Sequence, residues 1–193
     1  MKNIVILISG SGSNMAAIVQ AANQEDWQAK FNARIAAVIG NKPDANGLIL
    51  ANAMGIETKR LNHFAFATRE AFDAELMQEI GIYAPVLVVL AGFMRILTPG
   101  FVAYYTGRLV NIHPSLLPAF TGLNTHQRAI HVGCKLTGAT VHLVTENLDI
   151  GPILAQIEVA ILPSDTAKTL TTRVQIAEHI IYPQAIAKLL AAM

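Results

Sequence analysis

The chain has 193 residues, 53% hydrophobic and 14% charged, with a formal net charge of +1. This composition excludes a disordered chain and suffices for one large core, so we expect a single domain over residues 1–193. The balanced charge excludes nucleic acid as the main partner, because binding a phosphate backbone needs a clustered basic surface. No apolar run reaches the roughly 18 residues that would span a membrane, and the lone Cys134 precludes an internal disulfide, so we expect a cytoplasmic protein.

A glycine-rich segment, residues 9–14, follows the apolar run at residues 4–8 and precedes a helical pattern. Such a run is typical of a strand buried on both faces, here the central one. The backbone N–H groups of a glycine turn and a helix N-terminus bind anions. We therefore predict a phosphate site at Gly12, Ser13 and Asn14, with a merely structural tight turn as the alternative.

Two absences narrow the choice of anion. A dinucleotide fingerprint needs a third glycine where Met15 stands. The second strand, residues 34–39, is followed by Gly40 and Asn41 where a ribose-binding acid would be needed. A single phosphomonoester is the better interpretation.

The middle of the chain predicts a helix over 45–54, a short strand over 56–61 and a helix from about 68 to 82. Arg69 lies in the first turn of the last helix, where the helix dipole disfavours a cation. A ligand contact and a solvated surface arginine both remain open for it.

The apolar run at residues 85–91 predicts another strand that, like the one at residues 4–8, is buried on both faces. Open α/β sheets bind ligands beyond the carboxyl ends of their strands, so the next residues should line a pocket. Met94, Ile96 and Leu97 are suited to form apolar walls for a flat heteroaromatic ligand, with ordinary core packing as the alternative.

The stretch that begins at Arg108 predicts a short apolar strand with Asn111 and His113 on one face, because alternate side chains of a strand point the same way. Two polar residues that only cap a strand are the alternative. Pro114 places this pair at the strand's end. Ser115 is better explained as a turn-forming hydroxyl than as a nucleophile.

The last third of the chain predicts a reversal of strand direction and a long final helix. The expected features are a helix over 125–132, a strand over 137–144, a loop containing Asp149, a last strand over 153–161 antiparallel to its predecessor, and a helix capped by Ser164 and Asp165 and broken or kinked at Pro183. His126 and His131 fall on different helix faces, so we expect no metal site.

The amide of Asn111, the imidazole of His113 and the carboxylate of Asp149 are accompanied by no activated nucleophile. This set favours direct acyl transfer through a tetrahedral intermediate. In that chemistry Asn111 would bind the oxyanion, His113 would move protons, and Asp149 would orient His113 and favour its charged form.

Four segments resemble the signature segments of the phosphoribosylglycinamide formyltransferases, collinear over nearly the whole chain. They are residues 8–14, 90–97, 111–118 and 141–152. The resemblance implies a Rossmann-like α/β fold with one doubly wound, mostly parallel sheet and an antiparallel strand near its C-terminal end. It also implies formyl transfer from 10-formyltetrahydrofolate, as co-substrate and without a metal, to the amine of 5-phosphoribosylglycinamide in purine biosynthesis, by a monomer or homodimer.

The resemblance assigns roles residue by residue. Asn111, His113 and Asp149 match the catalytic trio; Gly12, Ser13 and Asn14 match the substrate-phosphate loop; Gln175 and Glu178 match a ribose-binding segment; and Arg69, Met94, Arg95, Ile96, Leu97, Asn111, Thr145 and Asp149 match folate contacts.

Two residues depart from the family pattern: Asn124 stands where a histidine is expected, and Thr121 where proline is common. Two other functions compete. Formyltetrahydrofolate deformylase shares the trio but would carry an additional N-terminal domain, whereas here the first strand begins at residue 4. A non-catalytic nucleotide-binding module would keep the glycine loop but has no need for the trio.

Overall fold

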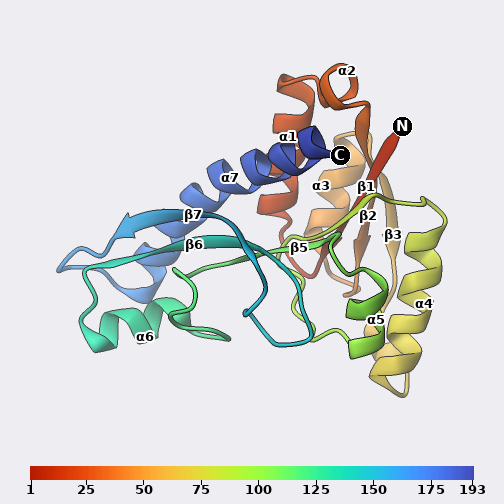
Figure 1. Cartoon of the computed structure of the whole chain (residues 1–193). Coiled ribbons are helices and arrows are strands. Elements are labelled where there is room, and N and C mark those ends of the chain that lie inside the picture. The colour runs from red at the N-terminus through yellow and green to blue at the C-terminus, as the bar shows by residue number, and fades with distance from the viewer.

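The computed structural model describes all 193 residues and is built on one seven-stranded sheet (Figure 1). The strands are β1 (Lys2–Ile8), β2 (Ala33–Gly40), β3 (Glu57–Arg60), β4 (Leu87–Leu90), β5 (Leu109–His113), β6 (Leu136–Leu143) and β7 (Ile153–Ala160). Their order is β3-β2-β1-β4-β5-β6-β7, so β1 lies inside the sheet between β2 and β4, but the central strand is β4 and not β1 as predicted. β6 pairs antiparallel with both β5 and β7, and it alone runs against the rest, which confirms the mostly parallel fold.

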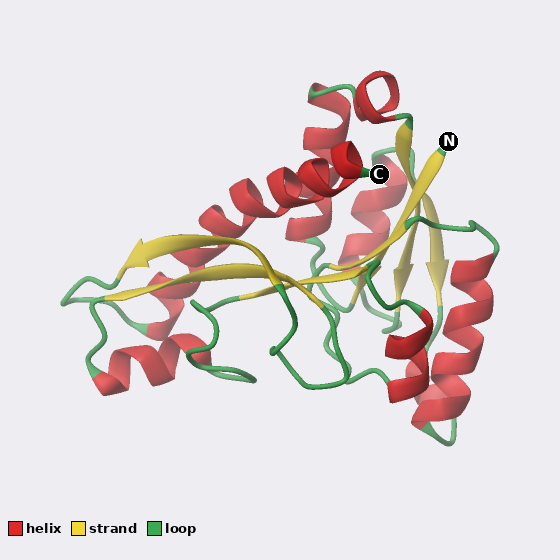
Figure 2. Cartoon of the chain, viewed as in Figure 1, coloured by secondary structure: helices red, strands yellow, loops and turns green.

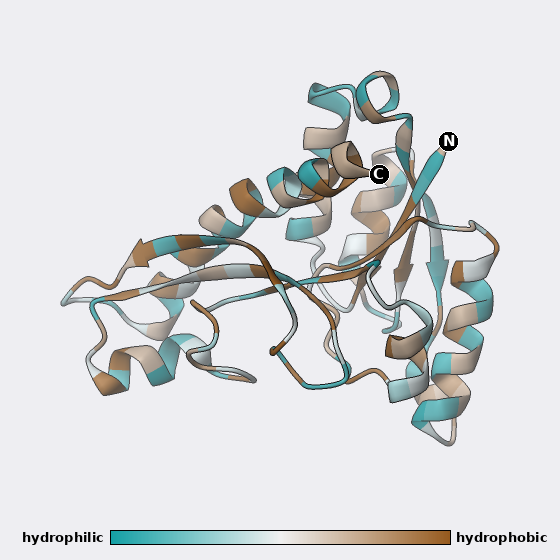
Figure 3. Ribbon diagram, viewed as in Figure 1, coloured by the Kyte–Doolittle hydropathy of each residue, from teal (hydrophilic) through white to brown (hydrophobic).

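Helices cover both faces of the sheet (Figure 2). They are α1 (Ser13–Gln24), α2 (Trp27–Phe31), α3 (Asn46–Ala53), α4 (Arg69–Gly81), α5 (Pro99–Tyr104), α6 (Thr125–Val132) and α7 (Ala167–Ala192), with a 3₁₀ turn, η1 (His63–Ala65). The alternation of β1 shows how the layers arise. Ile4, Ile6 and Ile8 pack in one apolar cluster with α1, α3 and α7, while Val5 and Leu7 pack in a second with α4 and α5. Figure 3 shows the hydrophobic colouring of the buried part of β1.

The C-terminal helix differs from its prediction at both places that the sequence singled out. Thr166, and not Ser164 or Asp165, caps α7 in a capping box with Thr169, because Arg173 binds both carboxylate oxygens of Asp165 at 2.6 and 2.9 Å. Of the break or kink predicted at Pro183, the break is wrong, since α7 continues through it to Ala192. A proline removes one helical hydrogen bond. The neighbouring side chains compensate by packing in the core: Ile181, Tyr182, Ala185 and Ile186.

No helix of the structure combines the length and the apolar character needed to cross a membrane.

Candidate active site

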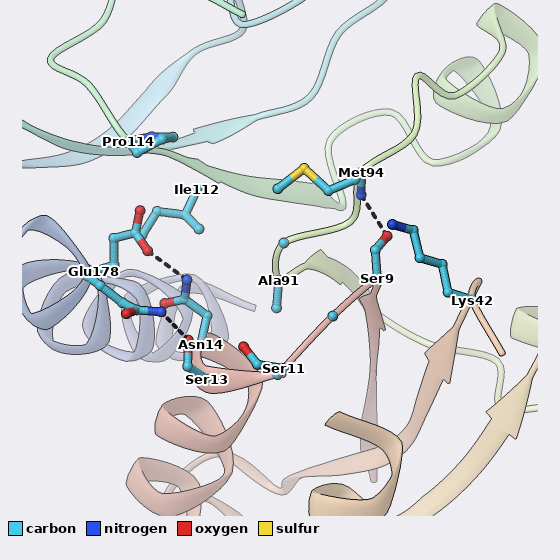
Figure 4. Close-up of a pocket in the computed structure, with 14 residues that line it drawn as sticks. Ser9, Ser11, Ser13, Asn14, Lys42, Ala91, Met94, Ile112, Pro114 and Glu178 are labelled. Atoms are coloured by element: carbon cyan, nitrogen blue, oxygen red, sulfur yellow. Dashed lines mark hydrogen bonds between the residues drawn. The ribbon is translucent and has the colours of Figure 1, made fainter. Parts of the chain in front are cut away.

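The glycine loop borders a cavity of about 340 Å³ at the carboxyl ends of β1 and β4 (Figure 4). Gly12, the N-cap of α1, has a φ of 77°, a left-handed conformation that glycine adopts without strain. No side chain caps this helix, and its first turn holds no acid. The first N–H groups of α1 are therefore available to an anion, and Gly12, Ser13 and Asn14 all line the cavity.

Helix α7 supplies the opposite wall of this cavity, which the two ends of the chain form together. Gln175 Nε2 donates to Ser13 Oγ at 2.7 Å, and Asn14 Nδ2 donates to Glu178 Oε2 at 2.8 Å. Burial raises the pKa of the Glu178 carboxyl, and the hydrogen bond from Asn14 opposes that rise. The predicted phosphate loop and the predicted ribose pair therefore meet in one cavity.

Lys42 is a lining residue that the sequence analysis missed. It follows β2, and Figure 4 shows its side chain extending toward Ser9 and Met94, across the cavity from Glu178. It is the only cationic side chain lining the cavity, and no carboxylate pairs with it. The available signal was its position just beyond the carboxyl end of a strand that neighbours β1.

A second, narrower cavity of about 130 Å³ lies between the segment after β4 and the loop after β6. Of the predicted folate contacts, those lining it are Arg95, Ile96, Leu97, Asn111, Thr145 and Asp149. Met94 faces the first cavity instead. Arg69, the first residue of α4, is exposed and lines neither cavity, so its ligand role stays a prediction.

The predicted trio comes together at the end of β5. His113 Nδ1 lies 3.4 Å from Asp149 Oδ2, although the two residues are far apart in the sequence. Asn111 and His113 occupy the same face of β5, and Asn111 is paired directly opposite His142 of β6. Asn111 Nδ2 lies 3.3 Å from His142 Nε2, which is 3.7 Å from Asp149 Oδ1. The cluster therefore contains a second imidazole.

Asp149 is held in place by backbone geometry as well as by the two histidines. It has a φ of 56°, and its Oδ2 accepts a hydrogen bond from Gly122 N at 2.9 Å. His113 is buried behind it and lines neither cavity. Its Nε2 lies 2.9 Å from the carbonyl oxygen of Phe120, so both ring nitrogens face acceptors.

The chain matches the formyl transferase family model over residues 2–186. This chain belongs to the formyl transferase family. It is 50% identical to phosphoribosylglycinamide formyltransferase of Escherichia coli over 95% of this chain and 85% of that protein. The crystal structure of phosphoribosylglycinamide formyltransferase from Brucella melitensis matches with a TM-score of 0.91 and 49% identity, over 100% of this chain and 97% of that one. That of glycinamide ribonucleotide transformylase 1 from Symbiobacterium toebii matches with a TM-score of 0.94 and 40% identity, over 100% and 89%.

His142 is the second imidazole of the cluster. Its sequence context predicts a strand but gives it no role in the site of this formyl transferase. Burial lowers the pKa of His142, while its contact with the Leu143 carbonyl and the nearby Asp149 act in the opposite direction. In the neutral ring, Nδ1 donates to Leu143 O at 3.0 Å and Nε2 accepts from Asn111 Nδ2. This contact orients the Asn111 amide and leaves its second N–H free.

The two departures from the family pattern lie in the loop that contacts Asp149. Asn124 caps α6 with a φ of 57°, which asparagine tolerates better than most residues. The Thr121 carbonyl accepts a hydrogen bond from Arg128 Nη1 at 2.6 Å. Gly122, between them, is the residue that donates to Asp149, so the loop keeps its contact with the cluster.

A smaller prediction concerns Ser115, which follows His113 and Pro114 in the chain. Ser115 Oγ donates to the Ala119 carbonyl at 2.6 Å, which confirms it as a turn-forming hydroxyl. No group of three His, Cys, Asp or Glu side chains in the structure is arranged to hold a metal ion.

Proposed function

We propose that this protein transfers a formyl group from 10-formyltetrahydrofolate to the amine of 5-phosphoribosylglycinamide, a step in purine biosynthesis, with residues 1–193 as a single formyltransferase domain. The observation that carries the proposal is that consecutive residues divide between the two cavities. Met94 and Ile112 line the first cavity, while Arg95 and Asn111 line the second. Two ligands bound there would meet beside the Asn111, His113 and Asp149 cluster.

The chemistry of each cavity supports one substrate. In the first, Gly12, Ser13 and Asn14 would bind the phosphate, and Gln175 and Glu178 the ribose hydroxyls. In the second, which has apolar walls beside polar groups, the pterin would contact a larger set of residues. That set is Arg95, Ile96, Leu97, Asn111, Thr145 and Asp149, with Arg69 and Met94 contacting the folate outside this cavity.

The amine attacks the formyl carbon, so a C–N bond forms and the carbonyl oxygen becomes an oxyanion. The free N–H of Asn111 stabilises this charge, an effect on the order of 10²-fold in rate in other enzymes. When the intermediate collapses, the bond from the formyl carbon to folate N10 breaks. His113 donates a proton to N10 by exchanging one of its two acceptors, and takes up the proton that the amine releases. Asp149 holds the imidazolium.

The same proposal fixes the partners and the compartment. The partners are two small molecules, 5-phosphoribosylglycinamide and the folate, and not nucleic acid or a membrane. The protein acts on them in the cytoplasm as a monomer or a homodimer. The experiment follows release of tetrahydrofolate with and without 5-phosphoribosylglycinamide. We expect turnover only with the amine. Turnover without it would identify a deformylase, and no turnover under either condition would favour a binding module.

Replacing Lys42 with methionine tests the phosphate site. We expect KM for 5-phosphoribosylglycinamide to rise about tenfold, because a charge-assisted contact contributes about 1.5–3 kcal/mol. KM for 10-formyltetrahydrofolate should stay within twofold. Lys30→Met, at an exposed lysine of α2, is the matched control. Equal KM values in wild type and Lys42→Met would remove Lys42 from the site.

A further inference from the structure

Asp73 of α4 is the most deeply buried carboxylate of the chain, with 2% of its surface exposed, and the proposed chemistry does not use it. Its Oδ2 accepts a hydrogen bond from Thr98 N at 2.6 Å, while its Oδ1 is buried without a partner. No cation pairs with it. Burying a carboxylate without a paired cation is costly, so this residue requires an explanation beyond packing.

Asp73 binds the end of a segment, residues 91–98, that separates the two cavities. Met94 lines the first cavity, and Arg95, Ile96 and Leu97 line the second. Backbone hydrogen bonds hold the start of the segment: Ala91 N donates to Leu7 O at 2.9 Å, and Ser9 N donates to Gly92 O at 3.2 Å. Two side chains anchor the rest: Ser9 Oγ accepts from Met94 N at 2.7 Å, and at the end of the segment Asp73 accepts from Thr98 N.

The anchors matter because two of the wall residues are not held by the core. Ile96 is 62% exposed, and Met94 is 67% exposed. The Arg95 guanidinium lies 4.8 Å from the ring centroid of Phe72, the residue next to Asp73. Helix α4 therefore supports the second-cavity half of the segment, whereas Ser9 of the glycine loop supports the first-cavity half.

The position of Asp73 also suits a negative charge. Thr98 is the N-cap of α5, so the carboxylate lies at the positive end of that helix and accepts the N–H of the cap residue itself. One contact thereby fixes both the end of the segment and the start of α5. Val102 of α5 lines the same second cavity.

We infer that Asp73 is a positioning residue for the folate pocket: through Thr98 N it holds residues 95–97 against the second cavity. The inference rests on the proposed function and adds a residue to it. Asp73 lines neither cavity, so its removal should weaken folate binding without changing the chemical step or the ribonucleotide site.

The test compares Asp73→Ala with Asp73→Asn. In Asp73→Ala we expect KM for 10-formyltetrahydrofolate to rise about tenfold, with kcat and KM for 5-phosphoribosylglycinamide within twofold. Asp73→Asn keeps the shape and one oxygen acceptor, so it should restore most of the folate affinity. Ser9→Ala, which removes the side-chain contact to Met94 N, should raise the ribonucleotide KM instead. Glu70→Gln, at an exposed acid of the same helix, is the matched control.

Two results would overturn the inference: an unchanged folate KM in folded Asp73→Ala, or equal increases in both KM values. If Asp73→Ala does not fold, Asp73→Asn decides, and a folate KM that is no more affected than the ribonucleotide KM overturns it. Calorimetric titration of wild type and variants with folic acid separates this failure from failure of the proposed function. Binding of folic acid measures the folate pocket without turnover. A wild type that binds folic acid but is inactive would contradict only the proposed reaction.

Discussion

Asp149→Asn should lower kcat by about 10²- to 10⁴-fold while leaving folate binding within a few fold. The substitution removes the negative charge that faces His113 at 3.4 Å and that lies 3.7 Å from His142. An amide placed there can present Nδ2 to His113, so the ring loses its carboxylate acceptor. In the proposed mechanism His113 donates the proton to N10, and this step should slow when the carboxylate no longer holds the ring.

This substitution separates chemistry from backbone geometry. Asp149 has a φ of 56°, a conformation that asparagine tolerates, so the loop should keep its course in the variant. The measurement is steady-state kinetics with both substrates, together with the melting temperature. Asp44→Asn, at an exposed acid outside both cavities, is the control. A kcat for Asp149→Asn equal to that of the control would exclude Asp149 from the mechanism.

Local rules were enough to predict the face that Asn111 and His113 share. The two residues are two apart in a strand that Pro114 ends, and strand alternation decides where their side chains point. The glycine loop was predictable for the same reason, because an apolar run, a glycine turn and a helix follow one another directly in the chain. Asp149 was different: alone in its loop it would pass for a surface acid, and only the presence of Asn111 and His113 elsewhere in the chain suggested a role for it in the site.

The residues that were missed depend on contacts between distant segments. Lys42 enters the first cavity because β2 lies beside β1, and His142 enters the cluster because it is paired with Asn111 across two antiparallel strands. Neither pairing can be deduced from a window of neighbouring residues. The same limit explains Pro183, where a local rule predicts a break and the packing of α7 on the sheet overrides it.

Gly151→Ala should lower kcat by about 100-fold through the same loop, without altering a polar group. A Cβ atom built on Gly151 overlaps the carbonyl oxygen of Leu143, at the end of β6, so one of the two backbones must move. The strand is held there by β5, because Leu143 is paired with Val110 and Val144 N donates to Leu109 O at 2.8 Å. The displacement therefore falls on the loop that carries Asp149, and a misplacement of about 1 Å can cost 10²-fold in rate.

The control for Gly151→Ala is Gly81→Ala, at the end of α4, where an added Cβ meets no atom within 4 Å. Alanine is favoured over glycine in a helix, so this variant should keep wild-type kcat and at least wild-type stability. A folded Gly151→Ala protein with the kcat of Gly81→Ala would mean that catalysis tolerates a displaced Asp149. Such a result, next to a large loss in Asp149→Asn, would show that the carboxylate acts by its charge at a distance and does not need its contact with His113.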